Sequence, residues 1–494
     1  MNQFKCSPHQ EAVLEAVREC KENLIVQAFA GSGKTTLCSQ AFMIHPDKKT
    51  LNLLFNKKNA KEAEEKNKKL GLNHVKSTTI HSLCYGSLIK NWGSVSVSFS
   101  GERMKKIISS HPKSKILTNP QKKILADSTS FLRSYNNILY SNFLFFLSMS
   151  GGMNFFDTDK GKSKISNGVH AKQGFEICVE CIEQSLNPSE IIDVDDMIYV
   201  TDKLGFPLPS FDYVYCDEFQ DMNEINHSII CRLAKNAKQV VAVGDRYQSI
   251  YSWRGADPRS MDNGKKSLNM KEFSLPETFR CSLNVVNHVK KIVPQFTARE
   301  NAPLGSVTSL RKDEIIDQIS AGDMIVSRKT APLAKILIKM FKSNIPARIE
   351  KGSDSSKDDF GIGGLIQKYE GSTTREMLKK LEMWKDLQIQ KLKDEKQHHA
   401  IENVKDKFET ILAFSEGTIL ASEVIQIVDN FSKLASSKEG VSISTVHRAK
   451  GMEAKNVFSI EEHYLSSKSM NPEEEINIKY VGHTRAIENL ILVY

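Results

Sequence analysis

The sequence lacks two features that membrane and secreted proteins need. It has no apolar segment at its N-terminus. Its most apolar run, ILYSNFLFFL at 138–147, is far shorter than the roughly 20 residues of a membrane-spanning helix. We therefore expect no membrane anchor and no signal peptide, and an intracellular, cytoplasmic protein. The run at 138–147 is expected to pack in a helical core.

A cysteine framework is also missing. The nine cysteines are scattered and odd in number, which indicates reduced, intracellular thiols. The closest spaced pair, Cys178 and Cys181, has no second pair or suitably placed histidines, as a structural zinc site would require. This pair therefore favours two cysteines on one face of a helix.

Strong charge of either sign is absent as well. The net charge is +9 in 494 residues, and 26% of the residues are charged. A mild basic excess suits an anionic partner such as nucleic acid, but an ordinary solvated basic surface fits equally well. The composition is that of a soluble globular protein, and the length predicts roughly two to four domains.

Apolar runs typical of buried parallel strands occur in two regions. The first region contains NLIVQAF, TLNLLF, FDYVYCDE and QVVAVGD, and the second contains GDMIVSRK, GVSISTVH, KNVFSI and NLILVY. Segments 91–189 and 351–435 lack such runs and are predicted to be mostly helical. In the latter, four apolar residues recur at the spacing of an amphipathic helix: Met377, Leu381, Trp384 and Leu387. The sequence therefore predicts an α/β fold with two bodies, each interrupted by a helical insertion.

The stretch AFAGSGKTT at 28–36 is typical of a phosphate-binding loop, although Ala28 stands where the general pattern has Gly. Its glycines let backbone N–H groups turn towards phosphate oxygens, and the following helix offers its N-terminus. Lys34 is expected to reach the β and γ phosphates, and the Thr35 hydroxyl to bind Mg²⁺. The residues predicted to bind the nucleotide here are Ala30, Gly31, Ser32, Gly33, Lys34, Thr35 and Thr36.

An acidic pair follows the apolar strand in FDYVYCDEFQD at 211–221. Asp217 at the strand end is expected to hold Mg²⁺, and Glu218 to orient and deprotonate the attacking water. A kinase has no need of the second acid, so the pair favours hydrolysis of ATP. Upstream, Gln10 is placed just before a helix and is a weaker candidate for a two-point hydrogen bond to adenine.

The segment VGDRYQSIYSWRGAD at 243–257, together with the phosphate loop and DEFQD, resembles the UvrD/Rep-type superfamily 1 (SF1A) DNA helicases. Further family motifs follow in order as LLFNKKNAKEAEEK (53–66), STTIHSLCY (77–85), IIDVDDMIY (191–199), LPETFRCS (275–282), STVHRAKGMEAKNVF (444–458) and YVGHTRAIENLILV (480–493). The likeness runs from about residue 3 to the last residue. The proportions resemble the compact phage-like and F-box-type members.

This resemblance implies two RecA-like P-loop motor domains with ATP between them. The expected divisions are a first motor domain at 1–90 plus 190–276, a helical insertion at 91–189, a second motor domain at 277–350 plus 436–494, and a reduced helical insertion at 351–435. Because the last strand-like run reaches Tyr494, we expect no C-terminal interaction tail or nuclease domain.

The resemblance also assigns residues to ATP. It implies that Arg280 and Arg485 act as arginine fingers on the γ-phosphate, and that Gln248 senses this phosphate. Phe279 matches an aromatic residue that stacks on adenine. Gly451 and Glu453 match positions near the phosphate and the ribose hydroxyl. With Lys34, Asp217 and Glu218, these residues form the expected catalytic centre for ATP and Mg²⁺.

A track for single-stranded DNA is implied in the same way. Aromatic side chains hold bases by stacking without regard to sequence, which suits a motor that moves along any strand. The residues at DNA-contacting positions are Phe55, Asn56, Lys57, Thr79, His81, Trp253, Arg254, Thr445 and His447.

Several positions depart from the family pattern. Tyr247 replaces a usual acid and is a candidate for an altered DNA contact. Phe279 stands where Tyr is usual. His483 replaces a small residue and is a candidate for pH-sensitive activity. The insertion at 351–435 is roughly half the size found in large bacterial members.

The function implied is an ATP-dependent DNA helicase that moves 3′→5′ and unwinds duplex DNA. It would act as a monomer on single strands and on junctions with duplex, and its candidate protein partners are replication or recombination proteins. It would work in the cytoplasm, in the nucleoid, or in a host cytoplasm if a phage encodes it. Three alternatives stay open: a translocase that strips proteins with little unwinding, an RNA-directed motor, and a nucleotide-switched binding protein.

Overall fold

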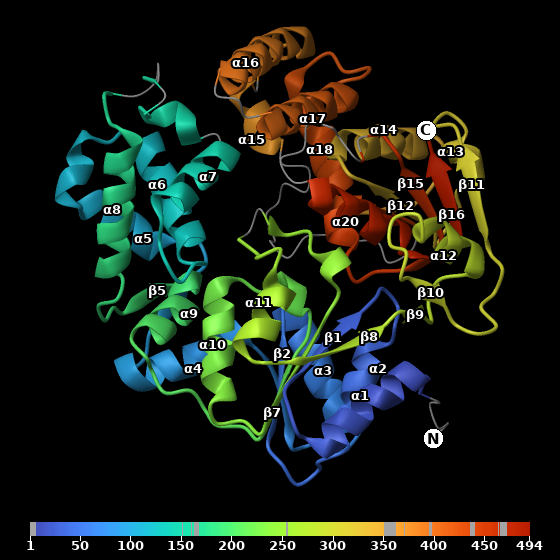
Figure 1. Cartoon of the computed structure of the whole chain (residues 1–494). Coiled ribbons are helices and arrows are strands. Elements are labelled where there is room, and N and C mark those ends of the chain that lie inside the picture. Colours follow the sequence, from blue (N-terminus) through green and yellow to red (C-terminus); the bar gives the residue numbers. More distant parts are fainter. Residues whose placement is uncertain are drawn as a thin grey trace. The chain divides into compact units, whose positions relative to one another are not determined.

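The computed structural model describes residues 6–150, 152–159, 161–162, 167–252, 255–349, 362–369, 371–394, 398–434, 440–462, 464 and 472–494. By its internal contacts the chain divides into two units. The first comprises the chain up to Phe29 and Gly33–Pro276, and the second comprises Ala30–Ser32 and Glu277–Tyr494. The elements are labelled in Figure 1.

The first unit is built on a six-stranded sheet in the order β3-β2-β6-β7-β1-β8, and every pairing is parallel. The strands are β1 (Leu24–Ala28), β2 (Thr50–Leu54), β3 (Val75–Thr79), β6 (Tyr213–Cys216), β7 (Gln239–Gly244) and β8 (Lys271–Leu275). Parallel neighbours need crossover connections, and helices supply them. α1 (Pro8–Glu19) precedes the first strand, and the helices between strands are α2 (Lys34–Phe42), α3 (Lys57–Lys69), α4 (Ile80–Trp92), α9 (Val194–Lys203), α10 (Glu224–Ala234) and α11 (Ser260–Ser267).

Both faces of this sheet are covered, which explains its continuous apolar strands. Along β1, Val26 packs in a cluster with Val13 of α1 and Leu37 of α2. The adjacent Ile25 belongs to a second cluster with Leu53 of β2. Successive side chains of the strand thus enter opposite layers of the core.

The first helical insertion consists of α5 (Glu102–Ser110), α6 (Asn119–Leu132), α7 (Tyr140–Ser150) and α8 (Ala171–Gln184), with short 3₁₀ turns. Its ends are joined by a small parallel pair, β4 (Ser96–Ser98) with β5 (Ile191–Asp193). Phe143 and Leu147 of α7 are fully buried, which confirms the helical core expected at 138–147. Cys178 and Cys181 are both fully buried on α8, which confirms that they share one helical face.

The second unit contains another six-stranded parallel sheet, in the order β11-β16-β15-β12-β14-β13. The strands are β11 (Ser306–Leu310), β12 (Met324–Ser327), β13 (Ala347–Ile349), β14 (Val441–Thr445), β15 (Ala454–Ile460) and β16 (Ala486–Val493). A short pair, β9 (Glu277–Thr278) and β10 (Thr297–Ala298), lies apart from it. The helices are α12 (Leu283–Val289), α13 (Ile315–Gln318), α14 (Thr330–Lys342), α19 (Val446–Ala449) and α20 (Pro472–His483). The eight runs predicted to be strands coincide with parallel strands of the two sheets, and the α/β fold class is confirmed.

The second insertion contains α15 (Gly363–Ile366), α16 (Thr374–Asp394), α17 (His398–Phe414) and α18 (Ala421–Leu434). Met377 and Leu381 of α16 are buried in the same cluster as Ile443 of the sheet. Leu387 is 55% exposed, so its predicted place in the apolar stripe is wrong. At about 100° per residue, Leu387 is rotated by about 80° from Met377, which carries it off the packed face.

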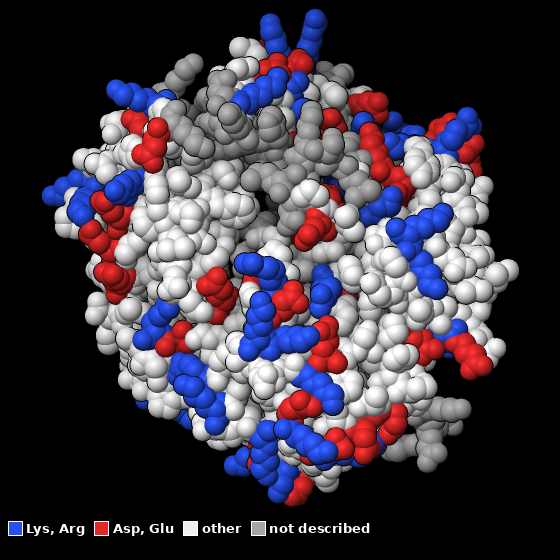
Figure 2. Space-filling view, viewed as in Figure 1, with Lys and Arg blue, Asp and Glu red and all other residues white. Residues whose placement is uncertain are grey.

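Within the described ranges, no helix combines the length and apolarity that a bilayer crossing demands. On the face drawn in Figure 2, Lys and Arg side chains lie among Asp and Glu side chains. The modest basic excess of the sequence is therefore not gathered into one continuous stripe on that face.

Candidate active site

The phosphate loop connects β1 to α2. Gly31 and Gly33 have φ angles of 72° and 81°, which lie in the left-handed region of backbone conformation. Glycine adopts this region at little cost in free energy, whereas residues with a Cβ atom are strained there. Gly33 is also the N-cap of α2 and provides no side-chain hydrogen bond there. The first N–H groups of α2 thus have no side-chain cap from this residue, as suits a helix end that receives an anion.

Lys34 ends this loop, and Gln10 of α1 lies beside it. The Nζ atom of Lys34 donates a hydrogen bond to the Ala28 carbonyl oxygen at 3.0 Å. Gln10 is not before the first helix, as the sequence indicated, but in its first turn, where it forms a capping box with Ser7. Its Nε2 atom would lie only 2.8 Å from a Cβ atom added to Gly33. The buried Gln10 amide therefore borders the loop, and its hydrogen bond to adenine stays a prediction.

Asp217 and Glu218 follow β6 directly. The backbone N–H of Glu218 donates to Oδ1 of Asp217 at 2.9 Å. Glu218 has a φ angle of 53°, a left-handed conformation that costs a non-glycine residue on the order of 1–2 kcal/mol. Such strain persists where the surroundings fix the residue, and it is concentrated at functional sites.

A buried polar network links the strand ends of β1, β6 and β7. Asp245, directly after β7, accepts hydrogen bonds from the side chains of Gln27 (2.9 Å) and Gln248 (2.8 Å). Gln220 donates to Glu218 at 2.5 Å and accepts from the Asp245 N–H at 2.9 Å. The sequence analysis identified Gln248 but missed Gln27, Gln220 and Asp245. Two of these were visible within the quoted motifs DEFQD and VGD, but the letters alone gave them no role.

Tyr247 lies next to the phosphate loop. Its ring stacks on Phe29, with ring centroids 5.7 Å apart and an interplanar angle of 22°. The altered DNA contact expected of Tyr247 stays a prediction. An aromatic ring at this position can stack on Phe29, whereas the acid usual in the family cannot.

Candidate DNA contacts in the first unit gather after β2 and β3. Phe55 is 36% exposed, and its ring lies parallel to that of Tyr251 at 6.0 Å. Tyr251 lies in the motif at 243–257 but was not singled out from the sequence. Asn56 and Lys57 are exposed at the start of α3, where Asn56 caps the helix by accepting from Asn59 N.

Thr79 and His81 are less accessible. Thr79 is 6% exposed and caps α4 by accepting from Ser82 N at 3.1 Å. His81 is half-buried, and burial lowers the pKa of its imidazole, an effect that Asp195 opposes. Trp253 and Arg254 lie outside the described residues. The roles of all these side chains in DNA binding stay predictions.

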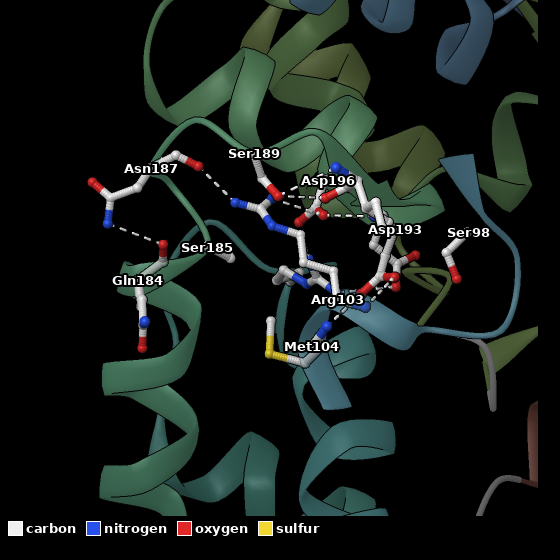
Figure 3. A network of polar contacts seen from close by, with 12 residues as sticks. Ser98, Arg103, Met104, Gln184, Ser185, Asn187, Ser189, Asp193 and Asp196 are labelled. Atoms are coloured by element: carbon white, nitrogen blue, oxygen red, sulfur yellow. Dashed lines mark hydrogen bonds and ion pairs between the residues drawn. The ribbon is translucent and has the colours of Figure 1, made fainter. Parts of the chain in front are cut away.

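The motif at 191–199 ties the first insertion to its motor unit (Figure 3). Asp193 accepts from the backbone N–H groups of Arg103 (3.1 Å) and the next residue, at the start of α5. Asp196 is fully buried and forms ion pairs with Arg103 (2.9 Å) and Arg133. Arg103 also donates to the Asn187 carbonyl at 2.6 Å. These acids therefore act in folding, binding two arginines that the sequence gave no reason to single out.

The second unit contains both candidate arginine fingers. Nε of Arg280 lies 2.5 Å from a carboxylate oxygen of Glu453, and its Nη1 donates to the Thr484 carbonyl at 3.2 Å. Arg485 is 1% exposed, and it donates to the carbonyls of Val481 (2.9 Å) and Met452 (3.0 Å). Arg280 thus donates to Thr484, the residue directly before Arg485, so the two arginines share one neighbourhood.

The remaining candidates of this unit lie on nearby segments. Glu453, expected near the ribose, is paired with Arg280, and Gly451 has a φ angle of 88°. Phe279 is half-buried beside β9. Thr445 ends β14 and His447 lies in α19, and both are partly exposed.

Two parallel sheets, a phosphate loop that enters a helix, and an acidic pair at the end of β6, two strands away from β1 in the same sheet, together define an α/β P-loop protein. The chain belongs to the UvrD/REP helicase family, because the family model of the UvrD/REP helicase N-terminal domain matches residues 9–269. The model of the UvrD-like helicase C-terminal domain matches residues 440–493.

Curated bacterial proteins are similar over part of their length. The ATP-dependent DNA helicase PcrA of Staphylococcus epidermidis is 25% identical over 313 residues, which cover 60% of this chain and 41% of that protein. PcrA of Staphylococcus aureus is 25% identical over 325 residues, which cover 62% of this chain and 42% of that protein. The match thus spans about two fifths of these relatives.

Proposed function

We propose that this chain is an ATP-dependent DNA helicase. One observation carries the proposal. The first unit of this chain holds the phosphate loop and the acidic pair Asp217 and Glu218, and the second unit holds the two arginines that share one neighbourhood, Arg280 and Arg485. The similar Staphylococcus proteins, both named ATP-dependent DNA helicase PcrA, support the choice of DNA as the track.

The first unit would bind ATP and prepare the attacking water. The N–H groups after Gly33 and the Lys34 ammonium would hold the phosphates. Glu218, kept in its left-handed conformation, would orient the water and take its proton. In this mechanism Gln220 fixes the Glu218 carboxylate through its hydrogen bond.

A magnesium ion fits the donor set of this unit. The exposed Thr35 hydroxyl and the Asp217 carboxylate provide the hard oxygen ligands that Mg²⁺ prefers. When bound with ATP, the ion would neutralise charge on the β and γ phosphates. Thr35 and Asp217 are therefore proposed to hold it.

Arg280 and Arg485 of the second unit would stabilise charge on the phosphoryl group during transfer. Arginine fingers contribute about 10³–10⁵-fold to turnover in related P-loop enzymes. Gln248, held by Asp245, would report the presence of the γ-phosphate to the rest of the first unit. Phe279, Gly451 and Glu453 would contact adenine, phosphate and ribose, and Glu453 would exchange its present partner Arg280 on doing so.

The parallel rings of Phe55 and Tyr251 would form the stacking platform for single-stranded DNA. We further propose 3′→5′ movement, action as a monomer on single strands and junctions, and the four-part domain division given above. The reduced second insertion belongs to that division.

The test is steady-state ATPase activity with and without single-stranded DNA, with Lys34→Ala as the control. The proposal expects strong stimulation that the control loses. Duplexes with a 3′ or a 5′ tail then report unwinding and direction. Stimulation by RNA in preference to DNA, or ATP hydrolysis on a single strand without unwinding, would contradict the helicase assignment.

A further inference from the structure

Helix α20 presents three ionisable side chains along one face. Glu475, Lys479 and His483 are four residues apart, so they lie one above the other on the helix. Each bonds to a residue outside the helix: Glu475 to Arg328 at 2.8 Å, and Lys479 and His483 to the two oxygens of Glu461 at 2.8 Å and 2.9 Å. The helix is therefore fixed to the ends of β12 and β15 by ion pairs.

The pair at the end of the helix is the most deeply buried. The side chain of His483 is fully buried and that of Glu461 is 4% exposed. Burial alone would raise the pKa of Glu461, but its bonds to His483 and Lys479 lower it to about 2. Glu461 thus stays a carboxylate, and moving His483 away would leave a buried charge with one partner fewer, which is costly.

Other groups confine the His483 ring on its remaining sides. The His288 ring on α12 lies 5.1 Å away, and burial together with His483 lowers the pKa of His288 to about 4. The Tyr464 ring meets His483 edge-on at 6.0 Å. The imidazole is therefore held in one place by an acid, a neutral histidine and a tyrosine.

His483 is two residues from Arg485. The Arg485 guanidinium donates to the carbonyl of Val481 in the last turn of α20, at 2.9 Å, and contacts the Thr484 hydroxyl at 3.4 Å. Any shift at the end of α20 would therefore move the groups that hold the Arg485 side chain.

We propose that the His483–Glu461 pair is a positioning pair for Arg485. This inference rests on the proposed function, in which Arg485 stabilises charge on the phosphoryl group during ATP hydrolysis. His483 touches no substrate in this scheme; it fixes the end of α20, and through Val481 and Thr484 it fixes the guanidinium. A misplacement of about 1 Å at a reacting centre can cost about 10²-fold in rate.

The experiment measures DNA-stimulated ATPase activity of the full chain for His483→Ala, Glu461→Gln, Arg485→Ala and the double variant His483→Ala/Arg485→Ala. His483→Ala and Glu461→Gln are expected to lower kcat by about 10–100-fold while KM for ATP changes by less than about twofold. Lys312→Gln, which removes the exposed ion pair with Glu462, is the matched control and should retain wild-type kcat. His483→Gln keeps a hydrogen-bond donor and is expected to recover most of the lost activity.

The double variant separates positioning from a general structural role. If His483 acts through Arg485, adding His483→Ala to Arg485→Ala lowers kcat no further. An additional tenfold loss in that background overturns the proposal, as does a wild-type kcat in both His483→Ala and Glu461→Gln. If the melting curve shows that His483→Ala does not fold, the same comparison is made with Glu461→Gln and with the double variant Glu461→Gln/Arg485→Ala. A wild-type protein without DNA-stimulated ATPase activity would instead overturn the proposed function itself.

Discussion

The Nε2 atom of Gln220 lies 2.5 Å from Oε2 of Glu218. Because the other amide atom of Gln220 accepts from the Asp245 backbone, the glutamine connects the ends of β6 and β7. The Glu218 carboxylate is thus linked, through Gln220 of its own loop, to the end of β7. This arrangement suits a group that must meet a water molecule at a fixed angle.

Replacement of Glu218 by alanine should remove turnover and preserve ATP binding. General-base catalysis contributes about 10²–10⁴-fold, so kcat should fall by that range. Steady-state ATPase assays give kcat, and binding of a fluorescent ATP analogue gives the affinity. Glu65→Ala changes an exposed carboxylate of the same unit and serves as the control. Normal turnover in Glu218→Ala would remove the residue from its assigned role.

Gly33→Ala should lower both stability and nucleotide affinity. Alanine at a φ of 81° is strained by about 1–2 kcal/mol, and its Cβ would meet Gln10 Nε2 at 2.8 Å. Gly71→Ala is the matched control, because Gly71 has a φ of 74° but open space around it. Urea unfolding should show a loss in both variants, whereas only Gly33→Ala should bind ATP more weakly. Equal ATP affinities in the two variants would contradict the phosphate-loop assignment.

Asp196→Asn should destabilise the first unit strongly. The change leaves the buried guanidinium groups of Arg103 and Arg133 without their shared carboxylate, which costs about 3–5 kcal/mol. Asp195→Asn alters the neighbouring acid, whose side chain is 38% exposed, and should cost less than about 1 kcal/mol. Denaturant unfolding of the two variants provides the comparison. Similar losses in both would mean that the buried pairs contribute little.

Phe55→Ala and Tyr251→Ala should each weaken single-stranded DNA binding by about 1–3 kcal/mol, the range found for stacking on one base. KM for ATP at saturating DNA should change little. Fluorescence anisotropy with a labelled oligonucleotide measures the affinity. Phe99→Ala removes an aromatic ring that is 88% exposed elsewhere in the first unit, and it should leave binding unchanged. An effect of Phe99→Ala equal to that of Phe55→Ala would argue against a localised platform.

Acid should destabilise the fold partly through His227. Burial lowers the pKa of this imidazole to about 4, and Nε2 lies 2.8 Å from the Ser260 hydroxyl. Between that value and the unfolded pKa of about 6.5, the unfolded chain binds the extra proton. The neutral His227 imidazole therefore makes its full contribution to the free energy of unfolding above about pH 6.5. This contribution, up to about 3 kcal/mol, is lost as the pH falls towards 4. Unfolding free energies of wild type and His227→Gln across this range should differ in slope, and parallel curves would contradict the assignment.

Much of the fold was readable from the sequence. Runs such as QVVAVGD are apolar at every strand position, which indicates a strand covered on both faces, and the structure has β7 there. The glycines and Lys34 of the phosphate loop could be placed because their chemistry fixes their spacing.

The remaining features depend on three-dimensional neighbours that no local pattern encodes. Arg103 and Arg133 look like any surface arginine in the sequence, yet both bind the buried Asp196. The stacking of Tyr247 on Phe29 joins residues more than 200 positions apart in the chain.

The place of β1 between β7 and β8 has a consequence for synthesis. This strand holds the first residues of the phosphate loop, and its neighbours on both sides are β7 (Gln239–Gly244) and β8 (Lys271–Leu275). During translation, β1 must therefore wait, unpaired on both edges, until the chain to Gly244 has left the ribosome, and its second edge stays unpaired until Leu275 has followed. Over that interval β1 would be a site for chaperone binding or for mispairing with other strands.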